Sequence, residues 1–254
     1  MTRTATRPRE VLLPVATLVA VVVVWWGVVR VFGIPAYLLP SPVAVGTRLV
    51  TSPGLYLRNA LVTLEKVLVG GTLGIVGGGL LAVGVATVPW LRRTLSPYLV
   101  TARVLPKIAV APVLLIYVGT GFSTAVVFVA LIAFFPMVVS TTAGLRSVPP
   151  HASDLLESVD ADPVRGFLTV RLPYAAPDVL AGVKQSLTLA VVGAVVAEWI
   201  VANQGLGFLV LLGSETVRPD VTLAAVTLLF VEGLALYGAV VLVQRWLPWT
   251  EGRS

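Results

Sequence analysis

Long apolar runs separated by short polar stretches are the main pattern along this chain. A helix needs about 20 apolar residues to cross the core of a bilayer, and six runs approach or exceed that length. The sequence therefore predicts an all-α integral membrane protein. The predicted transmembrane helices cover residues 11–32, 60–88, 98–118, 122–142, 177–201 and 221–247, within one transmembrane domain over 11–249 and between short tails at 1–10 and 250–254.

The second predicted span is unusually rich in glycine. Gly70, Gly74 and Gly78 are spaced four residues apart, so they lie on one face of a helix. In lipid, the need for internal backbone hydrogen bonds keeps such a segment helical. A face without side chains lets a second helix approach closely. We therefore expect a tight helix–helix contact along this face.

Residues 144–173 form a sizeable polar segment between the fourth and fifth predicted spans. The segment carries too many charges to lie in lipid, and its prolines favour short helices. Its acidic residues lack the alternating spacing and central glycine of a calcium-binding loop. We therefore interpret it as a solvated helical segment outside the membrane.

Composition supports the membrane interpretation. Of the 254 residues, 57% are hydrophobic and 12% are charged, whereas about 25% are charged in an average soluble domain. The chain has no cysteine and a single histidine, His151. These counts exclude disulfides, thiolate metal sites and multi-histidine metal sites. No basic run is interleaved with aromatic residues, so the net charge of +6 does not indicate a nucleic-acid partner.

The arginine distribution predicts the topology. With the N-terminus inside, ten arginines flank the inner ends of the predicted spans and four flank the outer ends. This bias places both termini and the 144–173 segment in the cytoplasm under the positive-inside rule. The four outer arginines are Arg30, Arg48, Arg58 and Arg218.

Charged residues within the spans are candidates for lining a polar path across the membrane, because a charge in lipid is costly. Arg103 and Lys107 share a helix face near the cytoplasmic end of the third span, where they either attract an anion or extend to the inner headgroups. Glu198 is either an outer gate or an ordinary span end. Glu232 lies in the middle of the sixth span, so we expect it to face protein or water.

No motif for covalent catalysis or phosphate binding is present. The cluster Gly77-Gly78-Gly79 lies inside an apolar span and not between a strand and a helix, so it does not meet the context of a dinucleotide-binding motif. We therefore do not expect this chain to be an enzyme.

The polar segment resembles the loop that marks permease subunits of bacterial ABC importers. That loop has Glu-Ala-Ala, three residues, Gly, nine residues, an aliphatic residue, one further residue, and Leu-Pro. Anchored on Leu172-Pro173, the spacing fits without a gap and puts Val170, Asp160 and Asp154 at the aliphatic, glycine and leading acid positions. Asp160 thus stands where the family has a turn glycine, and aspartate tolerates left-handed backbone better than most residues.

Flanking segments extend the resemblance to the nitrate, sulfonate and taurine branch of these permeases, over about residues 38–249. The similar segments are Leu39-Pro40-Ser41-Pro42, residues 103–112, Phe134-Phe135-Pro136, Gly144-Leu145-Arg146, Ala197-Glu198, Gly205-Leu206-Gly207 and Pro248-Trp249.

The resemblance implies a set of partners in a bacterial plasma membrane. They are a cytoplasmic ABC ATPase dimer, a second permease (the same chain or a related one) and an extracytoplasmic solute-binding protein. ATP and magnesium would be held by the ATPase, and this chain would hold no cofactor. The implied ATPase-coupling residues are His151, Asp154, Leu155, Leu156, Glu157, Asp160, Ala161, Pro163, Val164, Val170, Leu172 and Pro173.

The branch also implies a range of solutes: sulfonates, taurine and nitrate, or pyrimidine vitamin precursors. Arg103 and Lys107 favour an anion. An ion-coupled secondary transporter or a channel is the rival interpretation, and such a transporter needs midplane carboxylates and often has an inverted repeat. Glu232 is the one strong midplane acid, and the two halves of the chain show no convincing repeat.

Overall fold

The computed structural model describes residues 8–101, 106–149, 151–152, 158, 160 and 162–246. These residues form helices, turns and loops, with no strand among them. The helices are α1 (Pro8–Val31), α2 (Pro42–Thr51), α3 (Pro53–Thr87), α4 (Pro89–Thr101), η1 (Lys107–Val110), α5 (Ala111–Val118), α6 (Phe122–Arg146), α8 (Pro163–Gly166), η2 (Phe167–Arg171), α9 (Leu172–Val201), α10 (Leu206–Glu215) and α11 (Pro219–Arg245).

Five helical stretches of the described chain are long and apolar enough to cross a membrane: Leu12–Val31, Pro53–Thr87, Phe122–Arg146, Pro163–Val201 and Pro219–Arg245. Two shorter apolar stretches, Lys107–Val118 and Leu206–Glu215, accompany them. The predicted all-α membrane fold is thereby confirmed.

The third predicted span, 98–118, differs in the structure. Residues 89–97, which separate two predicted spans, belong to α4 (Pro89–Thr101), and η1 starts at Lys107. Pro106 between them has a non-helical ψ of 88°. Proline has no N–H for the helical hydrogen bond and its ring clashes with the preceding turn, so Pro106 disfavours a single continuous helix over 98–118. The apolar stretch that follows is 12 residues long, from Lys107 to Val118.

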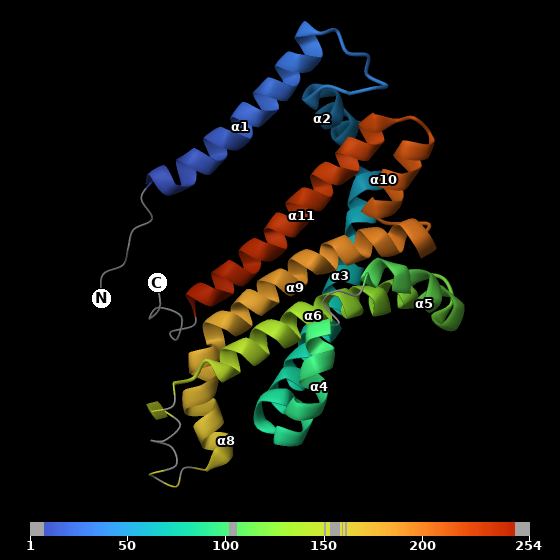
Figure 1. The fold of residues 1–254 in the computed structure, drawn as a ribbon. Coiled ribbons are helices and arrows are strands. Elements are labelled where there is room, and N and C mark those ends of the chain that lie inside the picture. Colours follow the sequence, from blue (N-terminus) through green and yellow to red (C-terminus); the bar gives the residue numbers. More distant parts are fainter. Residues whose placement is uncertain are drawn as a thin grey trace.

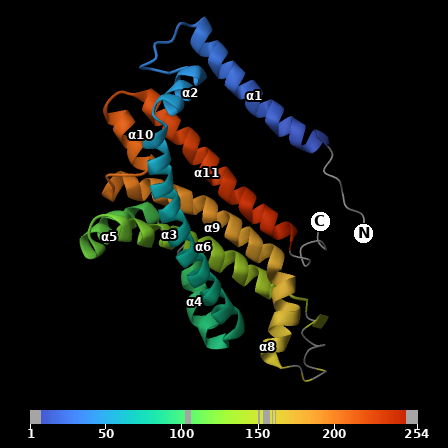
Figure 2. The same ribbon diagram turned by 180° about the vertical axis from the view of Figure 1, so that it is seen from behind.

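Helices α3, α6 and α9 form the packed centre of the molecule, and α6 makes extensive contacts with both of the others (Figure 1). Seen from behind, α3 crosses α6 and α9 at a steep angle (Figure 2). Helix α1 contributes little to this centre, because its apolar side chains are exposed along Leu12–Val31.

The two ends of the bundle carry different elements. Both figures place α8 at the same end as the beginning of α1 and the end of α11, and place α2 and α10 at the opposite end. The latter end also holds the beginnings of α3 and α11. We call these the α8 end and the α10 end.

The glycine face of α3 makes the expected close contact, and its partner is α6. A Cβ atom added at Gly70, Gly74 or Gly78 would stand 2.7, 2.5 or 2.6 Å from a backbone carbonyl oxygen of α6. These distances are too short for a side chain, so only glycine permits this approach of the two backbones. The three oxygens belong to Val126, Ala130 and Phe134.

Replacing Gly74 with alanine should therefore destabilise the bundle by about 1–3 kcal/mol, because the new methyl group must push α3 and α6 apart. The measurement is the free energy of unfolding in a denaturant titration in mixed micelles. Gly77→Ala is the matched control on the same helix, since its Cβ would meet only the Phe134 ring, at 3.8 Å. Equal stability of the two variants would contradict the packing account.

Candidate functional site

A buried ion pair joins two of the central helices near the α10 end. Lys66 of α3 places its Nζ 2.8 Å from Oε1 of Glu198 on α9, and the two side chains are 5% and 0% exposed. Thr63, one turn before Lys66, donates its hydroxyl to the same carboxylate at 2.9 Å. Two opposite charges that share hydrogen bonds can remain in a membrane interior, whereas either charge alone would be costly.

The same residues hold the connection between α9 and α10. The backbone N–H of Gly207 donates to Glu198 Oε2 at 2.7 Å, and that of Leu206 donates to Thr63 Oγ1 at 2.8 Å. Lys66 Nζ also donates to the carbonyl oxygen of Gln204 at 3.1 Å. The first amides of α10, which have no partner within their own helix, are therefore satisfied by side chains of α3 and α9.

Asn59 completes this network, which we call the α3–α9–α10 clamp (Asn59, Thr63, Lys66, Glu198 and residues 204–207). Its Oδ1 accepts the N–H of Gly205 at 2.7 Å, and its Nδ2 donates to Leu55 O at 2.8 Å. Gly205 has φ +121°, and a Cβ there would collide with the Glu198 carboxylate. Glycine is required at this position for both reasons.

The structure separates the residues that the sequence suggested for the translocation path. Glu198 is enclosed in the clamp and has no solvent exposure. Lys107 is half-buried, with its ammonium 5.0 Å from the centre of the Phe135 ring. Both carboxylate oxygens of Glu232 are buried and accept no hydrogen bond from the described residues. No ion pair or hydrogen bond joins these three within the described chain, and Arg103 lies outside it.

Sequence reasoning missed the α3 half of the clamp. Asn59, Thr63 and Lys66 follow the i, i+4, i+7 spacing of one helix face. That face continues directly into the glycines that pack on α6, so a polar stripe leading into a glycine stripe is the signal that could have identified it.

A second missed cation is Lys184 on α9. Its ammonium donates a hydrogen bond to the Gln244 side chain of α11 and lies 5.6 Å from the centre of the Tyr237 ring. Lys184 lines a depression of about 600 Å³ between α9 and α11, together with Gln185 and Thr188. These polar residues form a face of α9 that is unsuited to lipid.

The predicted coupling segment is described in part. Asp154, Leu155, Leu156, Glu157 and Ala161 lie outside the described residues, and His151 is exposed. Asp160, at the family's glycine position, has φ +45°. This backbone conformation is left-handed, and aspartate adopts it more readily than most residues.

A capped helical turn follows. The Asp162 side chain accepts the N–H of Arg165 at 2.9 Å, and Pro163 occupies the first helical position, so α8 begins with a regular N-cap. The chain then continues without a break through the π-helical turn η2, which includes Val170, into α9, which begins with Leu172 and Pro173.

Comparison with known proteins identifies the family. Residues 74–248 match the family described as binding-protein-dependent transport system inner membrane component. The chain belongs to this family. The match covers more than half of the chain, from the glycine face of α3 to the end of α11.

Relatives along nearly the full length carry permease names. The chain is 33% identical to a probable ABC transporter permease protein of Haemophilus influenzae over 90% of its own length and 94% of that protein. It is 33% identical to the riboflavin transport system permease protein of Chloroflexus aurantiacus, over 92% and 88% of the two chains. It is 28% identical to the taurine transport system permease protein of Escherichia coli, over 95% and 90%.

The fold is also that of a solved transporter. A chain in the crystal structure of an amino acid ABC transporter with histidines superposes with a TM-score of 0.65 at 18% identity, covering 79% of this chain and 98% of that one. The molecule is therefore a multi-pass permease subunit of the ABC importer type, and its relatives are transport subunits rather than enzymes.

The clamp predicts a specific pattern of stability. Lys66→Met leaves the Glu198 carboxylate buried without its cation and should cost about 3–5 kcal/mol of unfolding free energy. Lys66→Met combined with Glu198→Gln removes both charges and should be more stable than Lys66→Met alone. A denaturant titration in mixed micelles measures both effects.

Glu65→Gln is the control, since Glu65 neighbours Lys66 on α3 but is exposed. A double variant no more stable than Lys66→Met would show that charge pairing does not hold the clamp.

Proposed function

We propose that this permease subunit carries a small anionic solute inward across a bacterial plasma membrane and takes its energy from a separate cytoplasmic ATPase. The observation that carries the proposal is a pair of exposed apolar side chains at the α8 end. Val164 and Leu168 are four residues apart and are 66% and 53% exposed. Apolar side chains exposed beside the charged residues of a polar segment suit a protein partner better than water.

The helical continuity of this segment supports a coupling role. Residues Pro163–Val201 form one helical stretch of 39 residues, which follows a path of about 58 Å at 1.5 Å per residue and bends between α8 and α9 (Figure 1). One end carries the exposed pair Val164 and Leu168, and the other end carries Glu198 in the clamp. A displacement imposed at α8 by ATPase closure would therefore move the α10 end as part of one body.

The family membership and the α8 end support three partners. The 144–173 segment docks on one subunit of an ABC ATPase dimer, and ATP and magnesium are held there and not in this chain. A second permease, either a copy of this chain or a related chain, forms the other half of the path. An extracytoplasmic binding protein delivers the solute to the α10 end, which therefore faces outward. The α8 end, where α1 begins and α11 ends, then faces inward. Both termini of the chain are thus cytoplasmic, in accord with the arginine distribution.

The solute class rests on cationic side chains and on the taurine permease as a relative. Lys107 and Lys184 are half-buried cations without a carboxylate within ion-pair distance in the described chain. An anionic sulfonate, taurine-like or nitrate-like solute fits these charges. A vitamin or pyrimidine precursor is the alternative solute, favoured by the riboflavin permease relative.

Charge introduced at the exposed apolar pair should break the ATPase contact. Val164→Asp with Leu168→Asp is expected to lower co-purification of the cognate ATPase at least about tenfold, since a buried unpaired charge costs several kcal/mol. The control is Val43→Asp at the α10 end, where Val43 is 64% exposed. Undiminished ATPase recovery with the double variant would contradict the docking assignment.

Asp160 gives a test of the turn itself. Asp160→Gly should retain the ATPase, because glycine adopts φ +45° without strain, while Asp160→Val should weaken the association, because a β-branched residue is strained there. Co-purification measures both variants. If the valine variant binds the ATPase as well as the glycine variant does, the left-handed turn is not needed for docking.

A further inference from the structure

Three of the four arginines that oppose the positive-inside rule converge in space. Arg48 is on α2, Arg58 is on α3, and Arg218 directly precedes α11. All three line one depression of about 490 Å³ at the α10 end. Arginines on an outer flank work against the arginine bias that sets orientation, so their convergence on one depression indicates a use beyond topology.

The depression combines cationic, amide and apolar groups. Asn59, Asn203, Gln204 and Thr216 add polar side chains beside the arginines, and apolar residues form the remainder of the wall. The apolar lining residues are Leu55, Phe208, Leu209, Leu212 and Val221.

The arginines are incompletely neutralised. Asp220 Oδ2 lies 3.6 Å from Arg48 Nε and 3.0 Å from an Arg218 nitrogen, so one carboxylate serves two guanidinium groups. Arg58 has no carboxylate within ion-pair distance among the described residues. Three positive charges and one negative charge leave an excess of positive charge around the depression.

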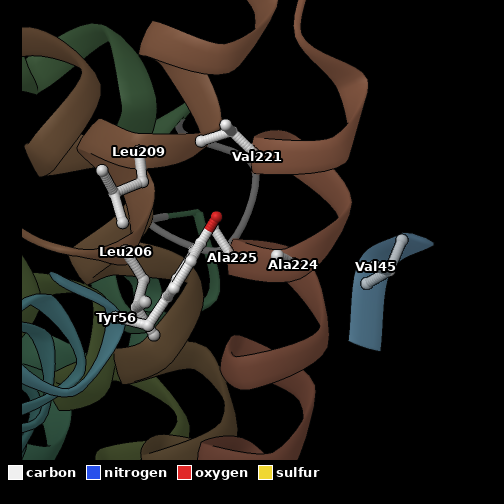
Figure 3. Close-up of a cluster of buried hydrophobic side chains, with 7 residues drawn as sticks. All are labelled: Val45, Tyr56, Leu206, Leu209, Val221, Ala224 and Ala225. Atoms are coloured by element: carbon white, nitrogen blue, oxygen red, sulfur yellow. The ribbon is translucent and has the colours of Figure 1, made fainter. Parts of the chain in front are cut away.

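Two buried polar atoms beside the depression lack a well-formed hydrogen bond. Tyr56 is 2% exposed, and neither its hydroxyl nor Arg48 Nε has hydrogen-bond geometry with a described residue, although Arg48 lies beside the hydroxyl and its Nε is 3.6 Å from Asp220. Figure 3 shows the Tyr56 ring extending from Leu206 towards Ala225 and Val221. Arg48, Asp220 and Arg218 are its charged neighbours, so the hydroxyl belongs to the same polar group.

The clamp fixes the floor of the depression. Asn59 and Gln204 line it, and both are held by clamp hydrogen bonds, from Gly205 N–H to Asn59 and from Lys66 to Gln204 O. The position of these lining groups is therefore tied to Glu198 and, through α9, to the α8 end.

We propose that this depression is an oxyanion-binding site, and that it holds the sulfonate or similar oxyanionic group of the solute when the solute enters the permease. Guanidinium groups bind such oxygens through paired, charge-assisted hydrogen bonds. The apolar lining residues accommodate a short carbon chain. The site rests on the proposed importer function in one respect: the α10 end faces outward.

The test measures anion binding directly, with the full chain and its ATPase in nanodiscs and without the binding protein. The probes are methanesulfonate and its neutral isostere dimethyl sulfone, and isothermal titration calorimetry gives the dissociation constants. Arg58→Gln should weaken methanesulfonate binding about tenfold, because a charge-assisted hydrogen bond is lost. Arg58→Lys keeps the charge and should lose less.

Arg30→Gln is the matched control, because Arg30 is the fourth outer arginine and does not line the depression. Wild-type binding of methanesulfonate but not of dimethyl sulfone, reduced by Arg58→Gln and unchanged by Arg30→Gln, supports the site. Absent methanesulfonate binding, equal binding of the two probes, or equal effects of the two substitutions would overturn it.

Two further outcomes would assign the arginines to another ligand and overturn the proposal. One is that Arg58→Gln weakens only binding-protein association; the other is that it weakens only retention of phosphatidylglycerol in the nanodisc. ATPase recovery is scored in the same preparations. Absent anion binding with the ATPase retained rejects the site alone, whereas a wild-type chain that never retains its ATPase rejects the proposed function.

Discussion

The ion pair between Lys66 and Glu198 is the interaction on which the α10 end depends. A charge in a membrane interior is far less costly when it is paired and hydrogen-bonded. Lys66 and Glu198 meet both conditions, because they lie at the junction of α3, α9 and the start of α10. Because the carboxylate also accepts the N–H of Gly207, the pair fixes the α9–α10 connection as well as two helices.

This arrangement joins two distant surfaces through one helical stretch. The exposed apolar pair Val164 of α8 and Leu168 of η2 lies at one end of a continuous helical stretch, and the clamp lies at the other. The glycine contact of α3 with α6 leaves little freedom between these helices, since their backbones touch. Under the proposed function, movement of α9 would therefore be passed to α10 and to the polar depression beside it.

Much of the fold was predictable because lipid imposes simple rules on a sequence. Hydropathy located the five long apolar helices, and the four-residue spacing of Gly70, Gly74 and Gly78 predicted a close helix contact. The break at Pro106 was the main difference, since apolar composition over 98–118 outweighed the prolines in the prediction. The clamp escaped prediction because Lys66 and Glu198 are 132 residues apart. A single sequence carries no signal for which distant helices meet. For the same reason it did not predict that Arg48, Arg58 and Arg218 line one depression.

The central claim is that energy for transport comes from outside this chain. The direct measurement is solute uptake into proteoliposomes that hold the permease, its ATPase and its binding protein, with ionophores present to collapse ion gradients. The account predicts uptake that requires ATP and the ATPase and that continues without any ion gradient. Uptake that proceeds without ATP and follows an imposed ion gradient would contradict it.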